Sequence, residues 1–525
     1  MQGTIRTNSF FFLLITLFLT SSVQAAEFKV NDDVDTTAQT TPTIAASVSG
    51  HVVVCWKSET SPDYGAERSG IQAQLYQSGS LPTEPDFQII RGYPLNEYPD
   101  VAMDLYGNFA ISWRTEEKDH HWLDAMLYNR HGAVIDTLLY GYEDNMDWGI
   151  GWKDPQGVCM DNNGNSVIAW AGSDRNVFAV RFDNEGSRVG ELIEVKMNLE
   201  GISNADIACS NATGDFVVCW MENWYEDIFA RLYNADGTPK GAAFQVTHEM
   251  GLMGTRKFDP AVAMDPQGNF MICWQAENGS DAGEICAQCY AADGTPIGNN
   301  FMVSHDPMER EKVQKKPAIA ADGFGNFVLC WTDGRNGNAD IFAQKMKIQG
   351  SQINPLGPNF RVNEDRGDAA QGSPDVHLKM GTMYFAWTDN RDENQSSNIY
   401  GKEMPWDADL NISVTAPNGG EAWQVVAEQT ITWESFGIYG DVKIEFSPDG
   451  GANWELLANS TPNDGERLWT PKERHASDNC LIKITSVEFP VISDVSDASF
   501  SVGGASNIVD VWPGDTNNDG TVTVA

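Results

Sequence analysis

The sequence predicts an all-β protein: a seven-bladed β-propeller that its N-terminal strand closes, followed by an immunoglobulin-like β-sandwich. Three observations predict the propeller. An apolar hairpin pattern recurs, each copy precedes two further strand-like segments, and the first and last repeats complete each other. The clearest copy reads "PAVAMDPQGNFMICW". Seven copies, 50 to 57 residues apart, end at Trp56, Trp113, Trp170, Trp220, Trp274, Trp331 and Trp387, a period typical of repeat folds.

Each repeat is expected to supply four strands. The first two form a hairpin, as in "PAIAAD", the turn "GFGN" and "FVLCW"; the second strand is continuously apolar, so both its faces must be covered. A third strand such as "IFARLY" follows a polar loop of variable length. The fourth has a Phe-x-Val or Phe-x-Ile pattern, clear at Phe87, Phe244, Phe301 and Phe360, weaker near Leu192 and almost absent between Ala133 and Leu139. Four short strands per repeat indicate a propeller blade.

Closure of the ring is predicted by an offset between the two ends of the repeat region. The segment "FKVND" at Phe28 matches "FRVNED" at Phe360, but it precedes the first hairpin, and the seventh copy lacks this strand. The N-terminal strand should therefore complete the seventh blade. A linear solenoid would need capping repeats at its ends, and the pattern contains none. We expect the propeller to span residues 26–405.

Residues 1–25 are predicted to be a secretory signal peptide. Arg6 is followed by the apolar run from Phe10 to Leu19 and by "SSVQA", which places small residues before the cleavage point. The run is too short to span a bilayer, so we expect a secreted, extracellular protein without membrane insertion. The formal net charge of −40 is spread along the chain. Because such a charge repels phosphate backbones, nucleic acid is excluded as a partner.

The positions of the nine cysteines do not indicate a disulfide framework. Cys55, Cys219, Cys273 and Cys330 each directly precede the repeat tryptophan, so they are expected to be buried small apolar residues. Cys286 and Cys289 in "ICAQC" have metal-like spacing. They lie in a predicted strand, however, where residues three apart face opposite sides, and a metal site is not expected.

Residues 406–503 are predicted to form the sandwich, because short strand-like segments follow one another closely there. The motifs "PNGGEAW", "ITW", "SPDGGANW" and "CLIKIT" resemble an immunoglobulin- or fibronectin-like module common in secreted modular bacterial proteins. The segment from Ser447 to Trp454 also fits the Asp box that recurs in sialidase blades. It occurs once and outside the propeller, so we expect a structural turn built by Asp449 and the two glycines.

After a linker at residues 504–512, residues 513–525 contain "GDTNNDGTVTVA". This segment resembles the first calcium loop of a dockerin domain, here truncated. The resemblance implies side-chain ligands from Asp515, Asn517 and Asp519, the carbonyl of Thr521, and a direct or water-mediated contact from Thr523. The final carboxylate of such a loop is missing, so calcium binding should be weak as the segment stands. A thrombospondin-type calcium repeat and a plain Asn/Asp/Gly turn are the competing interpretations.

The dockerin resemblance further implies a cohesin-bearing scaffold or cell-surface partner, and a setting of extracellular polysaccharide breakdown. We expect the intact protein to continue beyond residue 525 with an acidic residue, a helix and a second loop.

Acidic residues follow the repeat tryptophan in six copies, at Glu59, Glu116, Glu222, Glu277, Asp333 and Asp389. A closed ring could bring them to one rim as a cation site or an acid–base pair. Arg335 and Arg391 stand two residues after an Asp at equivalent positions. Because repeated pairs are what structural ion pairs produce, we expect a structural role for these acids, and the catalytic residues remain unknown.

Residues that break the repeat are the candidates for ligand binding. Aromatic rings beside polar groups stack on sugars, and the loops contain such residues at His120, His121, Trp122, Trp148, Trp152, Trp224 and Tyr225. The sequence therefore favours a secreted multimodular binding protein whose propeller recognises a polysaccharide, and catalysis is not the first expectation. The alternative is a propeller-type glycoside hydrolase or polysaccharide lyase that uses acidic loop residues. A purely structural surface component is the third hypothesis.

Overall fold

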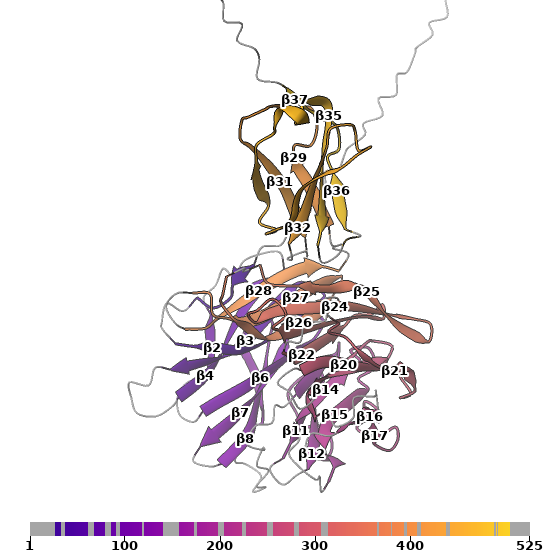
Figure 1. The fold of residues 1–525 in the computed structure, drawn as a ribbon. Helices are drawn as coiled ribbons and strands as arrows, with labels where there is room; N and C mark the ends of the chain where they lie inside the picture. The colour runs from indigo at the N-terminus through magenta and orange to yellow at the C-terminus, as the bar shows by residue number, and fades with distance from the viewer. Residues whose placement is uncertain are drawn as a thin grey trace, which may run out of the picture.

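The computed structural model describes residues 27–503 apart from short stretches, and it shows an almost entirely β protein in which a ring of sheets is followed by a separate sandwich (Figure 1). The undescribed internal stretches are 33–36, 61–67, 79–85, 91–94, 118–119, 140–156, 173–175, 198–203, 223–226, 249–255, 278–282, 306–312, 365–366, 380, 393–395, 407–410, 437–440, 488–489 and 491. Within the described part there is no α-helix, and none of its helical segments is long and apolar enough to cross a membrane.

Seven four-stranded antiparallel sheets lie within the described residues up to Pro405, numbered here in chain order. The first three contain β2 (Gln39–Ala46), β3 (His51–Thr60), β4 (Arg68–Gln77) and β5 (Phe87–Ile90); β6 (Leu95–Met103), β7 (Phe109–Glu117), β8 (His120–Tyr128) and β9 (Val134–Leu139); and β10 (Gly157–Met160), β11 (Ser166–Ala171), β12 (Val177–Phe182) and β13 (Ile193–Lys196). The fourth and fifth contain β14 (Ala205–Cys209), β15 (Phe216–Glu222), β16 (Asp227–Tyr233) and β17 (Phe244–Gln245); and β18 (Arg256–Met264), β19 (Phe270–Glu277), β20 (Gly283–Tyr290) and β21 (Pro296–Met302). The sixth and seventh contain β22 (Gln314–Ala321), β23 (Asn326–Asp333), β24 (Asp340–Gln349) and β25 (Gln352–Arg361); and β26 (Gln371–Lys379), β27 (Thr382–Asp389), β28 (Asn398–Pro405) and β1 (Phe28–Lys29).

The turn between the first two strands explains the recurring Gly-Asn pair. In the fifth sheet, one Asp265 oxygen accepts the Asn269 main-chain N–H at 2.8 Å, and the other accepts the Asn269 side-chain amide at 2.8 Å. Gly268 between them has φ +87°, a conformation that favours glycine. The hairpins are therefore fixed by their own turn chemistry, and the predicted hairpin is present in every sheet.

The first strands pack against one another in a closed cycle. Each one contacts the first strand of the next sheet, and β26 of the seventh sheet contacts β2 of the first. The seven first strands therefore surround one axis. The N-terminal β1 pairs with β28, with Phe28 opposite Gly401 and Lys29 opposite Tyr400, which is the pairing that the offset repeats predict.

The second strands are buried on both faces, as their continuous apolar character predicts. All eight residues of β23 are buried, and Cys55, Cys219, Cys273 and Cys330 have no exposed surface. Cys286 and Cys289 belong to apolar clusters on opposite faces of the fifth sheet, as expected for a strand. The fourth strand of the second sheet, whose pattern is almost absent from the sequence, does form as β9. Four of its six residues are exposed, which explains why the apolar pattern is lacking.

The sandwich packs two sheets around one apolar core that includes Ile412, Trp433, Phe446, Ile482 and Phe500. Its elements are β29 (Asn411–Ala416), β30 (Ala422–Gln424), β31 (Gln429–Phe436), β32 (Val442–Ser447), β33 (Glu455–Thr461), β34 (Glu466–Trp469), the 3₁₀ turn η2 (Glu473–His475), β35 (Ser477–Ser486), β36 (Ser493–Val495) and β37 (Phe500–Gly503). One sheet has the order β29-β31-β34, and the other has β30-β37-β35-β32-β33 with β36 beside β35.

The Asp-box segment forms the expected structural turn. Asp449 accepts the Ser447 hydroxyl at 2.8 Å and the Asn453 main-chain N–H at 2.8 Å with one oxygen, and the Asn453 amide at 2.6 Å with the other. Its hydrogen-bonding capacity is used within the turn.

Candidate active site at the axis of the ring

The first strands place one equivalent residue each beside the axis of the ring. Each of these residues directly precedes a Val or Ile in its first strand; they are Thr43, Asp100, Gly157, Asp206, Ala261, Ala318 and Asp375. Three of them carry carboxylates, from the second, fourth and seventh sheets, and we call Asp100, Asp206 and Asp375 the axial carboxylates. All three are half-buried.

Each axial carboxylate accepts a main-chain N–H from the next sheet. The Asp100 carboxylate accepts Val158 N–H at 2.7 Å, and the Asp206 carboxylate accepts Val262 N–H at 2.8 Å. The third closes the cycle, because Asp375 accepts the N–H of Ile44 in the first sheet at 2.8 Å. The same carboxylates thus line the axis and tie neighbouring sheets together.

Burial raises the pKa of all three carboxylates, and the charges of neighbouring carboxylates add to the shift at Asp100 and Asp206. For Asp100 the pKa rises to about 8, mainly because burial disfavours its charge, with the charges of Asp206 and Asp375 adding to the shift. Burial raises the pKa of Asp206 to about 7 and that of Asp375 to about 6, although main-chain N–H groups oppose both shifts. Near neutral pH the site therefore contains protonated and ionised carboxyl groups together.

The backbone just before the axial position is strained in five sheets. Thr41, Tyr98, Asp259, Lys316 and Ser373 have φ between +47° and +56°, although none is glycine. Each precedes a proline and lies at a register shift between the first and second strands. Strain of this kind persists only where the surrounding structure enforces it, and it concentrates at functional sites.

Threonines of the preceding sheet hold two of these strained residues in place. The hydroxyl of Thr332 accepts the N–H of Ser373 at 3.2 Å, and that of Thr388 accepts the N–H of Thr41 at 3.2 Å. Another strained residue joins three sheets, since Asp259 accepts the Asn204 amide at 3.1 Å and lies 3.1 Å from the Lys316 ammonium group. The end of the axis at which the first strands begin is thus rimmed by polar and charged side chains.

The acidic residues that follow the repeat tryptophans have the predicted structural role. Asp333 lies 2.7 Å from the Arg335 guanidinium group and also accepts the Trp331 indole N–H at 2.7 Å. Asp389 repeats both contacts in the seventh sheet, with Arg391 at 2.6 Å and Trp387 at 2.9 Å. The others also have polar partners, in their own strand or, for Glu222, also in the third sheet: Glu59 with Lys57, Glu116 with Arg114, Glu222 with Trp220 and Lys196, and Glu277 with Gln275.

Most of the predicted ligand-binding residues lie outside the described residues, namely Trp148, Trp152, Trp224 and Tyr225. The backbones of His120 and His121 pair with Glu117 and Glu116 at the start of β8, but their side chains also lie outside the description. Trp122 is half-buried, and its indole N–H donates to Asp124 at 3.1 Å.

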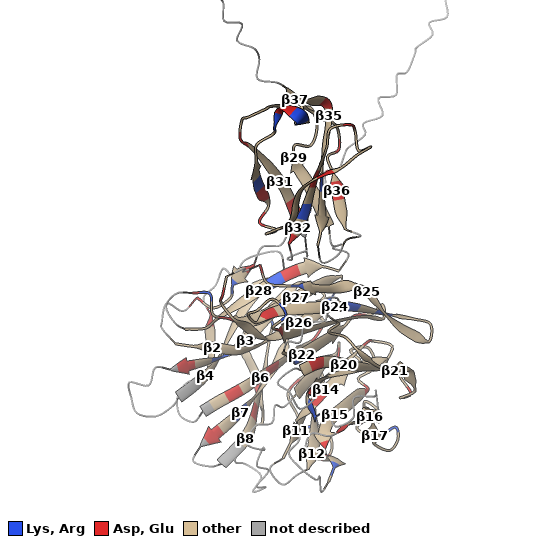
Figure 2. Ribbon diagram, in the orientation of Figure 1, with Lys and Arg blue, Asp and Glu red and all other residues tan. Residues whose placement is uncertain are grey.

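The predicted calcium ligands Asp515, Asn517, Asp519, Thr521 and Thr523 lie outside the described residues as well. In the part of the chain that the structure describes, no group of three or more His, Cys, Asp or Glu residues is arranged to hold a metal ion. Acidic residues occur on strands of both the ring and the sandwich (Figure 2), in keeping with the distributed charge of the sequence.

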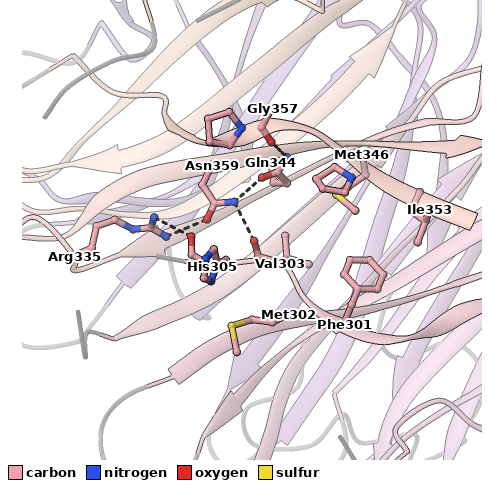
Figure 3. A pocket seen from close by; sticks show the side chains of 12 residues that line it. Phe301, Met302, Val303, His305, Arg335, Gln344, Met346, Ile353, Gly357 and Asn359 are labelled. Carbon is pink, nitrogen blue, oxygen red and sulfur yellow. Dashed lines mark hydrogen bonds between the residues drawn. The ribbon is translucent and has the colours of Figure 1, made fainter. Parts of the chain in front are cut away.

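A separate cavity of about 460 Å³ lies beside the outer strands β21 and β25. One end is polar, with Asn359 donating to Gln344 at 2.6 Å and to the Val303 carbonyl at 3.0 Å, and the other is apolar, with Phe301 and Ile353 (Figure 3). Its charged group, Arg335, is already paired with Asp333. The lining also includes His305 but no carboxylate, whereas three carboxylates meet at the axis, so the axis is the better candidate for an active site.

The axial carboxylates were not among the candidates predicted from the sequence. Those candidates were sought in the loops after each repeat tryptophan, whereas the axial carboxylates lie in the first strands. A signal was present in the sequence: "YPDVAM", "NADIAC" and "SPDVHL" have Asp where the other repeats have Thr, Gly or Ala. These are differences between copies of one repeat, which is the same criterion that selected the loop aromatics.

Comparison with known proteins gives similarity of fold only. No protein-family model matches the sequence, and no curated protein matches it. Among solved structures, a protein of unknown function from Dyadobacter fermentans DSM 18053 is similar with a TM-score of 0.44 at 10% identity, over 72% of this chain and 97% of that one. An alpha-L-arabinanase from Penicillium chrysogenum has a TM-score of 0.40 at 9% identity, with 60% and 94% covered, and AofleA from Arthrobotrys oligospora has 0.39 at 7%, with 65% and 92% covered. At this distance the similarities carry no argument about activity.

Proposed function

We propose that the chain is a carbohydrate-directed hydrolase of the propeller type, with acid–base chemistry at the axial carboxylates. The ring of seven sheets is interpreted as a seven-bladed β-propeller closed by β1, and residues 406–503 as an immunoglobulin-like module. The cyclic contacts of the first strands and the pairing of β1 with β28 support the ring. The two packed sheets around one core support the module.

The observation that carries the proposal is the meeting of three carboxylates at one repeated position of the first strands, close enough for their charges to interact. Glycoside hydrolysis needs one protonated carboxyl group as general acid and one ionised carboxylate as base or nucleophile. Asp100, with a pKa of about 8, retains its proton at neutral pH, whereas Asp375, with a pKa of about 6, is mostly ionised. We assign the acid role to Asp100 and the base or nucleophile role to Asp375, with Asp206 as a neighbouring charge that raises the pKa of Asp100.

The substrate class rests on the loops and on the tail. Trp122 lies in β8 and its indole N–H donates to Asp124, and the sequence supplies further aromatic residues for stacking on sugars at Trp148, Trp152, Trp224 and Tyr225. The dockerin resemblance of the tail also implies a setting of extracellular polysaccharide breakdown. We propose that the protein is secreted and that residues 513–525 begin a calcium-dependent attachment to a cohesin-bearing scaffold or surface protein.

A non-catalytic polysaccharide-binding protein is the second candidate. It is favoured by the hydrogen bonds of the axial carboxylates, since all three accept main-chain N–H groups from the next sheet. Groups of this kind hold a ring together whether or not they perform chemistry.

One experiment separates the two candidates. The full chain is incubated with a panel of soluble polysaccharides, and both retention of the protein and release of reducing ends are measured. A hydrolase releases ends from at least one polysaccharide, and Asp100→Asn and Asp375→Asn each lower that rate by 100-fold or more. Asp136→Asn, which changes an exposed carboxylate on β9 of the same sheet as Asp100, is the matched control and retains the activity. Retention without release supports the binding protein and rejects the hydrolase.

A further inference from the structure

The first strands of neighbouring sheets also meet in pairs one step beyond the axial carboxylates. The residue two after the axial position shares an apolar cluster with the residue three after the axial position of the next sheet, except that His377 instead forms a hydrogen bond with the main chain of Ala46. Around the ring these pairs are Ala45 with Met103, Ala102 with Met160, Cys159 with Cys209, Ala208 with Met264, Ala263 with Ala321, Ala320 with Leu378, and His377 with Ala46. Between the third and fourth sheets, both members are cysteines.

The contacts on either side of this pair fix its proximity. A Cβ placed on Gly157 would lie 3.0 Å from the main-chain nitrogen of Ile207, two residues before each cysteine. On the C-terminal side of the two cysteines, the N–H of Asn162 donates to the carbonyl of Asn211 at 2.8 Å. The two strands therefore run close together on both sides of the cysteines.

The two thiols also interact directly. Cys159 belongs to the apolar cluster between the third and fourth sheets, and Cys209 packs against the same cluster. The Cys209 side chain lies close enough to Cys159 to raise the pKa of its thiol. The structure records both as free thiols.

The pair differs in access to solvent. Cys159 is 7% exposed, whereas Cys209 is half-buried. Burial raises the pKa of the Cys159 thiol well above its usual value, and the neighbouring Cys209 adds to the effect. Cys209 is therefore the sulfur that a reagent from solution reaches first.

We propose that Cys159 and Cys209 form a disulfide bond that crosslinks the third and fourth sheets when the protein meets an oxidising compartment. The oxidant is a low-molecular-weight disulfide such as oxidised glutathione. The Cys209 thiolate attacks one of its sulfurs, breaks its S–S bond and releases one thiol as a mixed disulfide forms. The Cys159 thiolate then attacks the Cys209 sulfur and releases the second thiol. Two electrons pass to the oxidant, and the protons of the two cysteines end on the two thiols that leave.

The bond is tested on the full folded chain. The protein is incubated with oxidised glutathione, quenched with acid, denatured and alkylated, and its peptides are mapped by mass. We expect a crosslinked peptide pair containing Cys159 and Cys209, with the other seven of the nine cysteines alkylated. Cys209→Ala removes the crosslink, while Cys286→Ala, which replaces another buried cysteine, leaves it in place. Alkylation of all nine cysteines, or a persistent glutathione adduct on Cys209 without closure to Cys159, overturns the proposal.

A stability measurement gives an independent readout. The crosslink closes a loop of about 50 residues, which reduces the freedom of the unfolded chain. The oxidised protein should unfold at a higher urea concentration than the reduced protein. Cys209→Ala should show no such difference between the two conditions. An oxidised wild type that unfolds at the same or a lower concentration than the reduced form contradicts a crosslink compatible with the native ring.

Discussion

The axial carboxylates make a definite prediction about how stability depends on pH. Asp206 has a folded-state pKa of about 7 against an ordinary value of 3.8, so the folded state binds a proton that the unfolded state has already released in this interval. Stability must therefore fall as the pH rises from about 4 to about 7. Replacing Asp206 with Asn removes this titration and keeps a carbonyl oxygen to accept the Val262 N–H.

The size of the effect follows from the same value. Between pH 5 and pH 7 the folded and unfolded states differ by about one proton at Asp206, which corresponds to a loss of about 2 to 3 kcal/mol. Because the three carboxyl groups titrate together and water reaches them in part, about 2 kcal/mol is the expected difference.

The assay is urea unfolding of the full chain at pH 5 and pH 8, followed by tryptophan fluorescence. The stability of the wild type should drop between the two pH values by about 2 kcal/mol more than that of Asp206→Asn. Ile207→Val serves as the control, since it removes a buried methyl group from the same strand at a cost of about 1 kcal/mol and leaves the pH dependence unchanged. An identical pH dependence in Asp206→Asn and the wild type would show that the axial carboxylates do not retain protons.

Three further substitutions test other parts of the ring by urea unfolding at constant pH. Arg335 is only 2% exposed, and Asp333→Asn removes the carboxylate that pairs with its guanidinium group. This substitution should destabilise the protein by about 3 kcal/mol. A loss below about 1 kcal/mol would contradict a buried ion pair. Gly157→Ala places a Cβ 3.0 Å from a main-chain nitrogen of the next first strand and should cost about 1 to 3 kcal/mol, whereas Gly241→Ala, with nothing within 4 Å, should be tolerated. Phe28→Ala removes the aromatic side chain of the closing strand and should cost about 3 kcal/mol and increase proteolysis in the seventh sheet; unchanged proteolysis would show that this strand does not hold the ring closed.

The repeated part of the fold was predictable because its strands carry their own signals. Buried second strands are apolar on both faces, and turns such as that of Asp265 and Asn269 use side chains four residues apart, so both features are visible in short windows of sequence. The fourth strand β9 was harder to predict, since it is largely exposed and its pairing depends on β8 rather than on its own side chains.

The candidate site was predictable only in part, because it is assembled from residues far apart in the chain. Asp375 and Ile44 are hydrogen-bonded across 331 residues, and no local pattern shows that contact. The raised pKa values depend on burial and on neighbouring charges, both of which follow from ring closure. Once the ring is known, the three Asp residues stand out as exceptions at one repeated position.

The most direct test of the central claim is a crystal structure of Asp375→Asn with an oligosaccharide from a polysaccharide that the wild type cleaves or retains. We predict that a sugar ring binds where the first strands begin, with its glycosidic oxygen within hydrogen-bonding distance of the Asp100 carboxyl group. A sugar bound only on the outer strands or on the sandwich, with the axis left without ligand, would contradict an active site at the axial carboxylates.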